Sequence, residues 1–428
     1  MNISAFIFFI FWATFLWLVP KKYAVIPMLA SCCYMTLGQG IKIGCLSLPI
    51  FRMMMVVGLV RSIFKKEKIE GGLNKIDKLI IFLSGWLFFS SFFHNGLDSS
   101  GPVYIGGFIF NLLSIYFLIR IWTQDSENFS EQVRIIALML IPLALAMLIE
   151  KMTSKNMFSI FGGVPITSLI REGKVRAQGP FRHPILAGTV GGTCVPMFVG
   201  IFKQNKLVAG LGIIASVIII FSSSSSGPVM SFFLGVGAMV MWKFRNFTRM
   251  ILNIVFLVYL ILSLVMKNPP YYLISKIDIS GGSTGWHRAI LIDKTFSHLS
   301  EWWLFGTDQT RDWMPNQGIG ASVNHTDITN YYISFGIMGG VLAIILFVYI
   351  IIYAFQWVGF LINSSNHSNR KNFMVWAFGA GLFSHVATGI SVSYFDQSML
   401  FYWFNIALIS SIYSSQSSHR FSKVVGGE

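Results

Sequence analysis

The sequence predicts an all-α polytopic membrane protein with about 12–13 transmembrane helices and a large extracytoplasmic loop containing short helices. Of the 428 residues, 54% are hydrophobic and 11% are charged, whereas soluble domains have about 25% charged residues. Many apolar stretches approach the roughly 20 residues that a helix needs to cross a hydrocarbon core about 30 Å thick. The formal net charge is +15, but the basic residues lie in short segments between those stretches. This placement indicates membrane topology and disfavours a nucleic-acid partner.

The apolar windows divide the chain, residues 1–428, into spans of one transmembrane domain. The predicted spans lie near residues 3–19, 24–38, 43–62, 79–94, 102–121, 134–150, 184–202, 207–223, 227–242, 250–266, 329–357, 372–390 and 396–414. The stretch at 3–19 lacks a preceding basic region and a following small-residue cleavage site, so we expect it to stay as the first span. The stretch at 24–38 is the weakest, because it is short and contains Pro27.

Two predicted loops stand out by their length. Placing the short basic segments in the cytoplasm puts the amino terminus outside and the carboxy terminus inside. The loops at 151–183 and 267–328 then both face the outside. The first is basic, with Lys151, Lys155, Arg171, Lys174, Arg176 and Arg182 against one acid, Glu172. Positive charge is disfavoured on that side, so this loop is expected to bind an anion.

The second long loop contains a helical pattern after Ser283 and Thr284. Apolar side chains of this pattern fall near one face and basic ones nearer the other. The apolar set is Trp286, Ile290, Phe296 and Leu299; the basic set is His287, Arg288, Lys294 and His298. We expect a helix that lies at the outer membrane surface, with Trp302 and Trp303 as interfacial anchors.

The segment from Arg176 to Pro184 is the strongest candidate for chemistry. It places Arg176, Arg182 and His183 immediately before a predicted span. Arginine binds phosphate oxygens in pairs through its planar fork, and a helix amino terminus also attracts anions. The pattern indicates a phosphate site. The alternative is contact with acidic lipid headgroups or outer-surface glycolipids.

Two further segments are polar at the ends of spans. The serine run at 222–226 is suited to bind a sugar or a diphosphate, or else it forms a small-residue turn that lets helices pack closely. The second segment runs from Asn324 to Tyr332 and enters the next predicted span. If the helix begins near His325, then Asp327 and Asn330 share a face, and His325 can accept a proton from a hydroxyl group or orient that group. The alternative is that Thr326 or Asp327 caps the helix and His325 is interfacial.

The sequence gives no sign of a metal or a cofactor. The histidines lack a ligand spacing such as His-Glu-x-x-His, and no glycine-rich nucleotide loop is present. The four cysteines, Cys32, Cys33, Cys45 and Cys194, lie in or beside apolar runs and do not predict a disulfide framework. A sugar donor that is already activated by a lipid phosphate would need neither a metal ion nor a nucleotide-binding loop.

Four motifs in order resemble one known superfamily. They are Arg176-x-x-Gly-x-x-x-His-Pro184, the serine turn at 222–226, Gly285-Trp-His-Arg288 and His325-Thr-Asp-x-Thr-Asn330. Together, over roughly residues 170–415, they resemble the O-antigen ligase and O-antigen or exopolysaccharide polymerase superfamily, which are bacterial membrane glycosyltransferases of the GT-C type. The histidine segment differs from a His-Asn-x-Tyr-like run and looks more like that of the polymerases.

The resemblance implies a multi-pass enzyme of the bacterial inner membrane whose active site faces the periplasm. It implies metal-independent, inverting transfer of a glycan from undecaprenyl diphosphate to a hydroxyl of an acceptor glycan or glycolipid, with a chain-length regulator as a further partner. By this resemblance Arg176 and Arg288 bind the diphosphate, with Arg182 as support, and His325 acts on the acceptor hydroxyl. His183, Asp327, Asn330 and Trp286 complete the expected substrate-binding set.

Three alternatives stay open at the level of sequence. A polymerase delivers the glycan to another lipid-linked repeat unit, whereas an O-antigen ligase delivers it to lipid A core. A flippase or transporter of lipid-linked oligosaccharide would carry its decisive charges near the bilayer midplane, on broken helices. The candidate residues here lie instead at the outer ends of spans and in loops, which favours an enzyme.

Overall fold

Helices make up most of the protein in a computed structural model of the whole chain. The structure describes residues 1–94, 100–123, 128–276, 285–310, 313, 328–364 and 369–425. Within these ranges, six helical segments are long and apolar enough to cross a membrane. They are Gly101–Trp122, Phe129–Thr153, Pro184–Ile201, Lys206–Ser223, Ser226–Val265 and Tyr331–Asn363. An all-α polytopic membrane protein is therefore confirmed.

Each predicted span has a helix over at least part of its length. The helices are α1 (Ile3–Leu18), α2 (Val25–Tyr34), α3 (Ile50–Phe64), α4 (Lys75–Ser91), α5 (Ser100–Trp122), α6 (Asn128–Thr153), α7 (Pro184–Ile201), α8 (Lys206–Ser223), α9 (Ser226–Val240), α10 (Thr248–Val265), α13 (Tyr331–Ser364), α14 (Asn369–Thr388) and α15 (Ser398–Val425). Short 3-10 helices are η1 (Lys21–Tyr23), η3 (Met157–Phe161), η4 (Met241–Phe247) and η5 (Pro270–Lys276).

Two of the predicted spans are wrong in part. The stretch at 24–38 is helical only over the ten residues of α2, a length of about 15 Å, which is short of a hydrocarbon core about 30 Å thick. The stretch at 43–62 begins in a β-hairpin, β1 (Gly40–Ile43) with β2 (Leu46–Pro49), and becomes helical at Ile50. Gly40 permits this hairpin, since an added Cβ would lie 2.3 Å from the Leu48 carbonyl oxygen.

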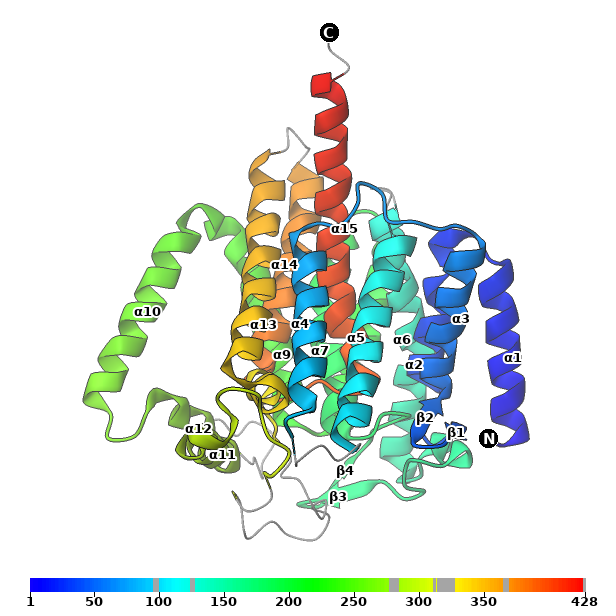
Figure 1. Cartoon of the computed structure of the whole chain (residues 1–428), viewed down its shortest axis with the longest axis horizontal. Coiled ribbons are helices and arrows are strands. Elements are labelled where there is room, and N and C mark those ends of the chain that lie inside the picture. The colour runs from blue at the N-terminus through cyan, green and yellow to red at the C-terminus, as the bar shows by residue number, and fades with distance from the viewer. Residues whose placement is uncertain are drawn as a thin grey trace.

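The long helices run side by side, and the two termini lie at opposite ends of the bundle (Figure 1). Helix α7 lies at the centre, with 89% of its residues buried, and packs on α8, α9 and α14. Its glycines permit this close approach: a Cβ at Gly188 would lie 2.4 Å from the Ser223 hydroxyl oxygen, and one at Gly192 would lie 2.7 Å from the Pro228 carbonyl oxygen. Small residues serve the same purpose in other membrane bundles.

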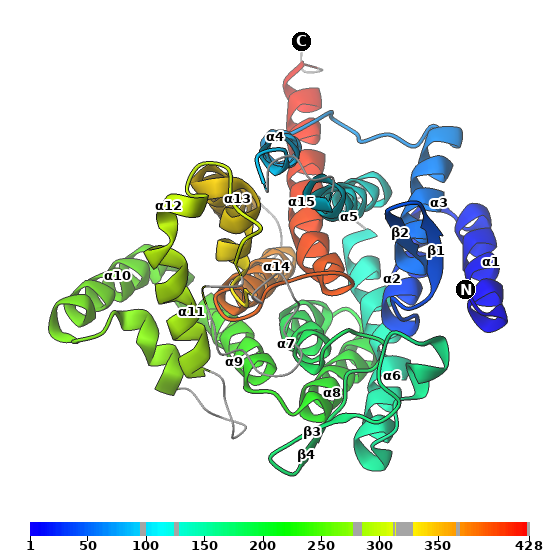
Figure 2. The same ribbon diagram turned by 60° about the horizontal axis from the view of Figure 1, so that its bottom comes forward.

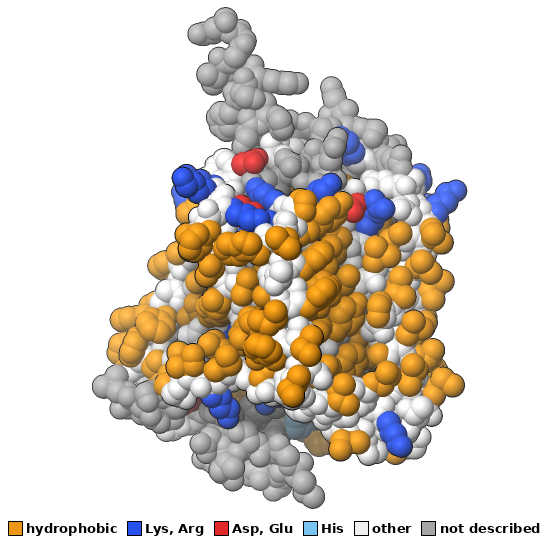
Figure 3. Space-filling view, turned by 90° about the vertical axis from the view of Figure 1, so that its right-hand side faces the viewer, with side chains coloured by type: hydrophobic (Ala, Val, Ile, Leu, Met, Phe, Trp, Pro, Cys, Tyr) orange, Lys and Arg blue, Asp and Glu red, His pale blue; other side chains and the backbone are white. Residues whose placement is uncertain are grey.

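Apolar side chains cover the outside of the bundle. Figure 3 shows a broad hydrophobic surface, with Lys and Arg side chains gathered mainly along its upper edge. Helix α10 has no buried residue and stands apart from the other helices (Figure 1). Contiguous exposed apolar surface of this extent fits a bilayer as the solvent.

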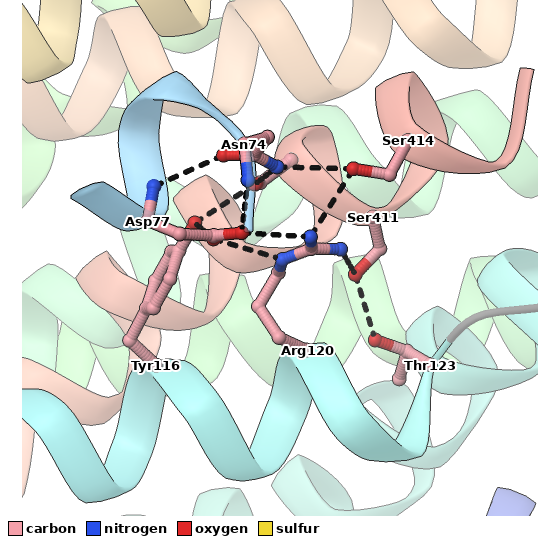
Figure 4. Close-up of polar contacts among 8 residues, drawn as sticks. Asn74, Asp77, Tyr116, Arg120, Thr123, Ser411 and Ser414 are labelled. Carbon is pink, nitrogen blue, oxygen red and sulfur yellow. Dashed lines mark hydrogen bonds and ion pairs between the residues drawn. The ribbon is translucent and has the colours of Figure 1, made fainter. Parts of the chain in front are cut away.

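A buried polar network ties three helices together near the end of the bundle that carries the carboxy terminus (Figure 4). Arg120 on α5 donates to both carboxylate oxygens of Asp77 on α4, at 3.1 and 3.0 Å. The Tyr116 hydroxyl donates to the same carboxylate at 2.6 Å. Hydroxyl groups of α15 complete the network, with Ser411 and Ser414 each accepting from Arg120. The ion pair is thus satisfied on both sides, as a buried pair requires.

The β-strands and the short helices α11 and α12 lie at the other end of the bundle, together with the amino terminus (Figure 1). Between α6 and α7 are η3 and a second hairpin, β3 (Leu169–Arg171) with β4 (Lys174–Arg176). Between α10 and α13 are η5, α11 (Gly285–Ser297) and α12 (Leu299–Trp302). The predicted helix after Thr284 is confirmed by α11. Figure 2 turns this end toward the viewer, with β4 beside α8.

Helix α13 is interrupted where this segment docks against it. Gly339 and Gly340 are non-helical, and Gly340 has a φ of 72°, which favours glycine. The Thr307 amide donates to the Ile337 carbonyl and the Val341 amide to the Trp303 carbonyl, each at 2.8 Å. The break in α13 thereby provides partners for the Trp303 carbonyl and the Thr307 amide. These two bonds hold the segment after α12 in place.

Candidate anion-binding site

The strand that carries Arg176 is held along the serine turn between α8 and α9. The Ala177 amide donates to the Ser222 carbonyl at 2.9 Å. The Ser224 hydroxyl and the Lys151 ammonium group donate to the Val175 carbonyl at 3.0 and 3.1 Å. These bonds satisfy the outer backbone of β4, so a short hairpin is fixed against the ends of two long helices. The serine turn and the arginine segment, which are separate in sequence, form one structure.

A buried carboxylate fixes the residues that follow Arg176. Glu150, near the end of α6, is 1% exposed. It accepts hydrogen bonds from the Gln178 amide at 3.1 Å, the Gly179 amide at 2.8 Å and the Ser168 hydroxyl at 2.9 Å. Gly179 has a φ of 58°, a backbone conformation that favours glycine. The Arg176-x-x-Gly motif is therefore a backbone turn wrapped around the Glu150 carboxylate.

Arg176 lies under this turn with its guanidinium group incompletely bonded. The side chain is 5% exposed, and its Nη2 donates to the Ser225 hydroxyl at 2.7 Å. Its Nε is buried and has no hydrogen-bond partner in the described part of the chain. Burial lowers the pKa of Arg176 to about 10, with smaller contributions from the charges of Arg171 and Arg288. The side chain is still a cation at neutral pH, and it has donors to spare.

Arg288 reaches the same region from α11. It lies on the buried face of that helix with Ala289 and Ile292 and is 8% exposed. Its Nε is also buried and without a partner among the described residues. Burial lowers its pKa, and the charge of Arg171 lowers it further. The prediction that Arg288 lies on a basic face opposite the packed face of this helix is therefore wrong. Arg288 lies on the face by which α11 packs against the rest of the protein.

The position of α11 is set by η5. The hydroxyl groups of Tyr271 and Tyr272 both donate to the Asp293 carboxylate. An added Cβ at Gly285 would lie 2.3 Å from the Ile274 carbonyl oxygen, so the start of α11 approaches η5 backbone to backbone. These contacts hold α11 against η5 and hence fix the backbone from which Arg288 extends.

His183 brings the start of α7 into the same group. Its Nδ1 accepts from the Ile185 amide at 3.2 Å and caps the helix, with Pro184 in the first turn. Burial, together with the charges of Arg176, Arg288 and Arg171, lowers the pKa of His183 to about 4. His183 is therefore a neutral imidazole at physiological pH. The charges of Arg176, Arg288 and Arg171 all act on this ring.

No carboxylate forms an ion pair with Arg171, Arg176 or Arg288 within the described ranges of the chain. Buried cations without counter-ions are costly, and each unsatisfied buried donor adds to that cost. A bound anion would remove both costs, because guanidinium groups bond phosphate and carboxylate oxygens in pairs. The arrangement is that of a site for a multivalent anion.

The other predicted site residues lie outside this group. Arg182 is exposed and pairs with Asp396, at 3.4 Å, in the segment between α14 and α15. Trp286 is 57% exposed on α11. Asn330 accepts from the Tyr332 and Ile333 amides and donates to the Ile390 carbonyl at 3.0 Å. It therefore caps α13, which begins at Tyr331 instead of near His325. His325 and Asp327 lie outside the described residues.

Two residues of the group were not singled out as site residues from the sequence. Ser225 is one of five consecutive serines, and only the fold shows which of them bonds Arg176. Arg171 lies five residues before Arg176, a separation that means little until the hairpin register is known. Among the described residues, no three His, Cys, Asp or Glu side chains gather into a group that would hold a metal ion.

Comparison with protein-family models finds no match for this chain, and comparison with curated proteins finds none either.

Proposed function

We propose that the protein is a polysaccharide polymerase of the bacterial inner membrane. It transfers a glycan from undecaprenyl diphosphate to a hydroxyl group of an acceptor lipid-linked repeat unit at the periplasmic face, with inversion and without a metal. The observation that carries the proposal is the pair of buried arginines, Arg176 and Arg288, each with an Nε that has no partner among the described residues. They lie at one end of an apolar helix bundle, where the headgroup of a membrane-anchored donor would be.

The bond that breaks explains why arginines suit this reaction. The C1–O bond between sugar and phosphate cleaves, and its electron pair leaves with the lipid diphosphate. Fixed guanidinium groups stabilise negative charge where it develops, without reorganisation during the step. Arg176 is held by Ser225 and Arg288 by the packing of α11, so both are positioned before the donor binds.

The acceptor hydroxyl forms the new C1–O bond and loses a proton. By the sequence resemblance, His325 accepts that proton or orients the hydroxyl. His183 has a different role: its lowered pKa keeps it neutral, and its Nδ1 caps α7. We assign His183 to shaping the diphosphate site, where a neutral ring adds no further positive charge.

Reconstituted transfer tests the proposal. The purified full-length protein is incubated with undecaprenyl-diphosphate-linked repeat units alone, in the presence of a chelator, and glycan length and released undecaprenyl diphosphate are measured. A ladder of products is expected from the wild type, and Arg176→Ala and Arg288→Ala should form none. Arg134→Ala is the matched control, because Arg134 forms a partly exposed ion pair with Glu131 in the first turns of α6.

The acceptor arm of the same experiment separates the alternatives. If product forms only after lipid A core is added, the protein is an O-antigen ligase and the polymerase assignment is wrong. If neither acceptor yields product while the lipid-linked repeat crosses the membrane of proteoliposomes, the protein is a transporter.

A further inference from the structure

The hairpin β3–β4 places Arg171 on the same face as Arg176. In its register Leu169 pairs with Arg176 and Arg171 pairs with Lys174. Paired residues share a face and alternate residues along a strand do too, so Arg171 and Arg176 are diagonal neighbours. The backbones of such neighbours lie about 7–8 Å apart. Two guanidinium groups at this separation can both bond one elongated anion that lies between them.

The turn of this hairpin is tight and its geometry is defined. Glu172 and Gly173 have φ values of 51° and 72°, the positive values of a two-residue turn that matches the twist of paired strands. Immediately before β3, two bonds of Ser168 fix the chain. Its amide donates to the Ser154 carbonyl at 3.0 Å, and its hydroxyl group donates to the Glu150 carboxylate. Both strands are therefore anchored, so the side chain of Arg171 projects from a fixed backbone.

The electrostatic influence of Arg171 extends over the whole group. Its charge lowers the pKa of Arg176 on β4, of Arg288 on α11 and of His183 before α7. No carboxylate in the described ranges pairs with it. Arg171 is also more exposed than the other two arginines, which are 5% and 8% exposed. The three cations thus differ in exposure, with Arg176 and Arg288 buried and Arg171 half-buried.

Resting on the proposed function, we propose that Arg171 is a third anion-binding residue and that it makes the site select a diphosphate over a monophosphate. One phosphate can satisfy the inner pair, Arg176 and Arg288. The second phosphate of a diphosphate adds charge and oxygens beyond that pair, on the side where Arg171 lies. A monophosphate ends before it reaches Arg171, so it gains little from that side chain.

Binding to the full-length protein in lipid nanodiscs tests this inference. The probes are farnesyl diphosphate, farnesyl monophosphate and inorganic pyrophosphate, with affinities measured by thermophoresis for the wild type, Arg171→Ala and Arg171→Lys. Lys155→Ala is the control, because Lys155 carries the same charge in the same loop and is exposed. Monodisperse elution and an unchanged melting temperature establish that each variant is folded.

The wild type is expected to prefer the diphosphate by about tenfold or more, as one charge-assisted contact provides. Arg171→Ala should lose about tenfold in affinity for both diphosphates and less than about threefold for the monophosphate, while Lys155→Ala changes neither. Arg171→Lys should recover part of the preference through its charge. The pyrophosphate arm shows whether the site takes the diphosphate itself or requires the attached lipid.

Two results would overturn the inference, and only the second would also overturn the proposed function. If the wild type binds farnesyl diphosphate and Arg171→Ala behaves like Lys155→Ala, or weakens all three probes equally, the role of Arg171 is wrong while the anion site stands. If the wild type binds none of the three probes, the proposed function fails as well.

Discussion

The side chain of Arg176 donates a hydrogen bond of 2.7 Å to the hydroxyl group of Ser225, across 49 residues of sequence. The bond joins β4 to the first residue before α9. It uses one Nη of the guanidinium group, and the buried Nε has no partner in the described part of the chain. Arg176 is therefore oriented by the fold and still able to bind an anion.

Variants of this pair should differ in severity. Arg176→Ala should reduce the transfer rate at least about 100-fold, because a charge at the leaving group is lost. Arg176→Lys should also be impaired, since an ammonium group does not reproduce the fork. Ser225→Ala should cost about tenfold or less, because orientation is lost but the charge stays. The measurement is the initial rate of undecaprenyl diphosphate release. Ser226→Ala is the control, and a Ser226→Ala effect equal to that of Ser225→Ala would contradict the assigned contact.

Glu150 should be required for the shape of the site and not for its charge. Glu150→Gln keeps one acceptor oxygen but weakens the bonds to the Gln178 and Gly179 amides, each of which gains from the charged acceptor. We expect the melting temperature and the transfer rate to fall together. Glu131→Gln, in a partly exposed pair with Arg134, should change neither the melting temperature nor the transfer rate by a comparable amount. A Glu150→Gln protein with wild-type stability and rate would refute this anchoring role.

His183 should contribute a defined pH dependence to stability. Its pKa is about 4 in the folded protein, against 6.5 in an unfolded chain. Between these values the unfolded state binds more protons, so stability rises with pH through this window and falls on acidification from 6.5 toward 4. His183→Asn retains a capping side chain without the titration. The variant should therefore lose less in melting temperature than the wild type between pH 6.5 and pH 4.5. Parallel curves for the two proteins would show that His183 does not titrate in this way.

The network of Figure 4 should matter for stability far from the anion site. Arg120 and Asp77 are 1% and 0% exposed, and removing one partner of a buried pair costs about 3–5 kcal/mol. Arg120→Ala should lower the melting temperature strongly and reduce activity only in proportion to the folded fraction. Arg134→Ala, which breaks a partly exposed pair between residues three apart on one helix, should cost about 1 kcal/mol or less. Similar melting temperatures for the two variants would contradict the structural role of Arg120.

Hydropathy located the helices well and their ends less well. The window at 43–62 reads as one apolar span, yet it begins inside a hairpin whose strands alternate, with Ile41 and Ile43 on either side of Lys42 and Leu46 and Leu48 on either side of Ser47. A hydropathy average does not separate a period of two from a buried helix over so few residues. The start of α13 was also misplaced, because the cap is Asn330, and several polar residues before it have the same capping potential.

The anion site could be predicted only in its components. Arg176 and Arg288 were identified as residue types suited to phosphate, but their burial and missing counter-ions follow from tertiary packing. Hydrogen bonds join Arg176 and Ala177 to the serine turn, which lies about 50 residues later in the sequence. No local sequence pattern predicts these contacts. Arg171 acquires its place from the hairpin register. Asn330, expected to bind substrate, caps α13 in the structure.

A structure of the protein in lipid nanodiscs with bound farnesyl diphosphate tests the central claim most directly. We predict density for the diphosphate with its oxygens about 3 Å from the guanidinium nitrogens of Arg176 and Arg288, and with the farnesyl chain on the apolar surface of the bundle. A diphosphate bound elsewhere, with neither guanidinium group in contact with it, would contradict the account.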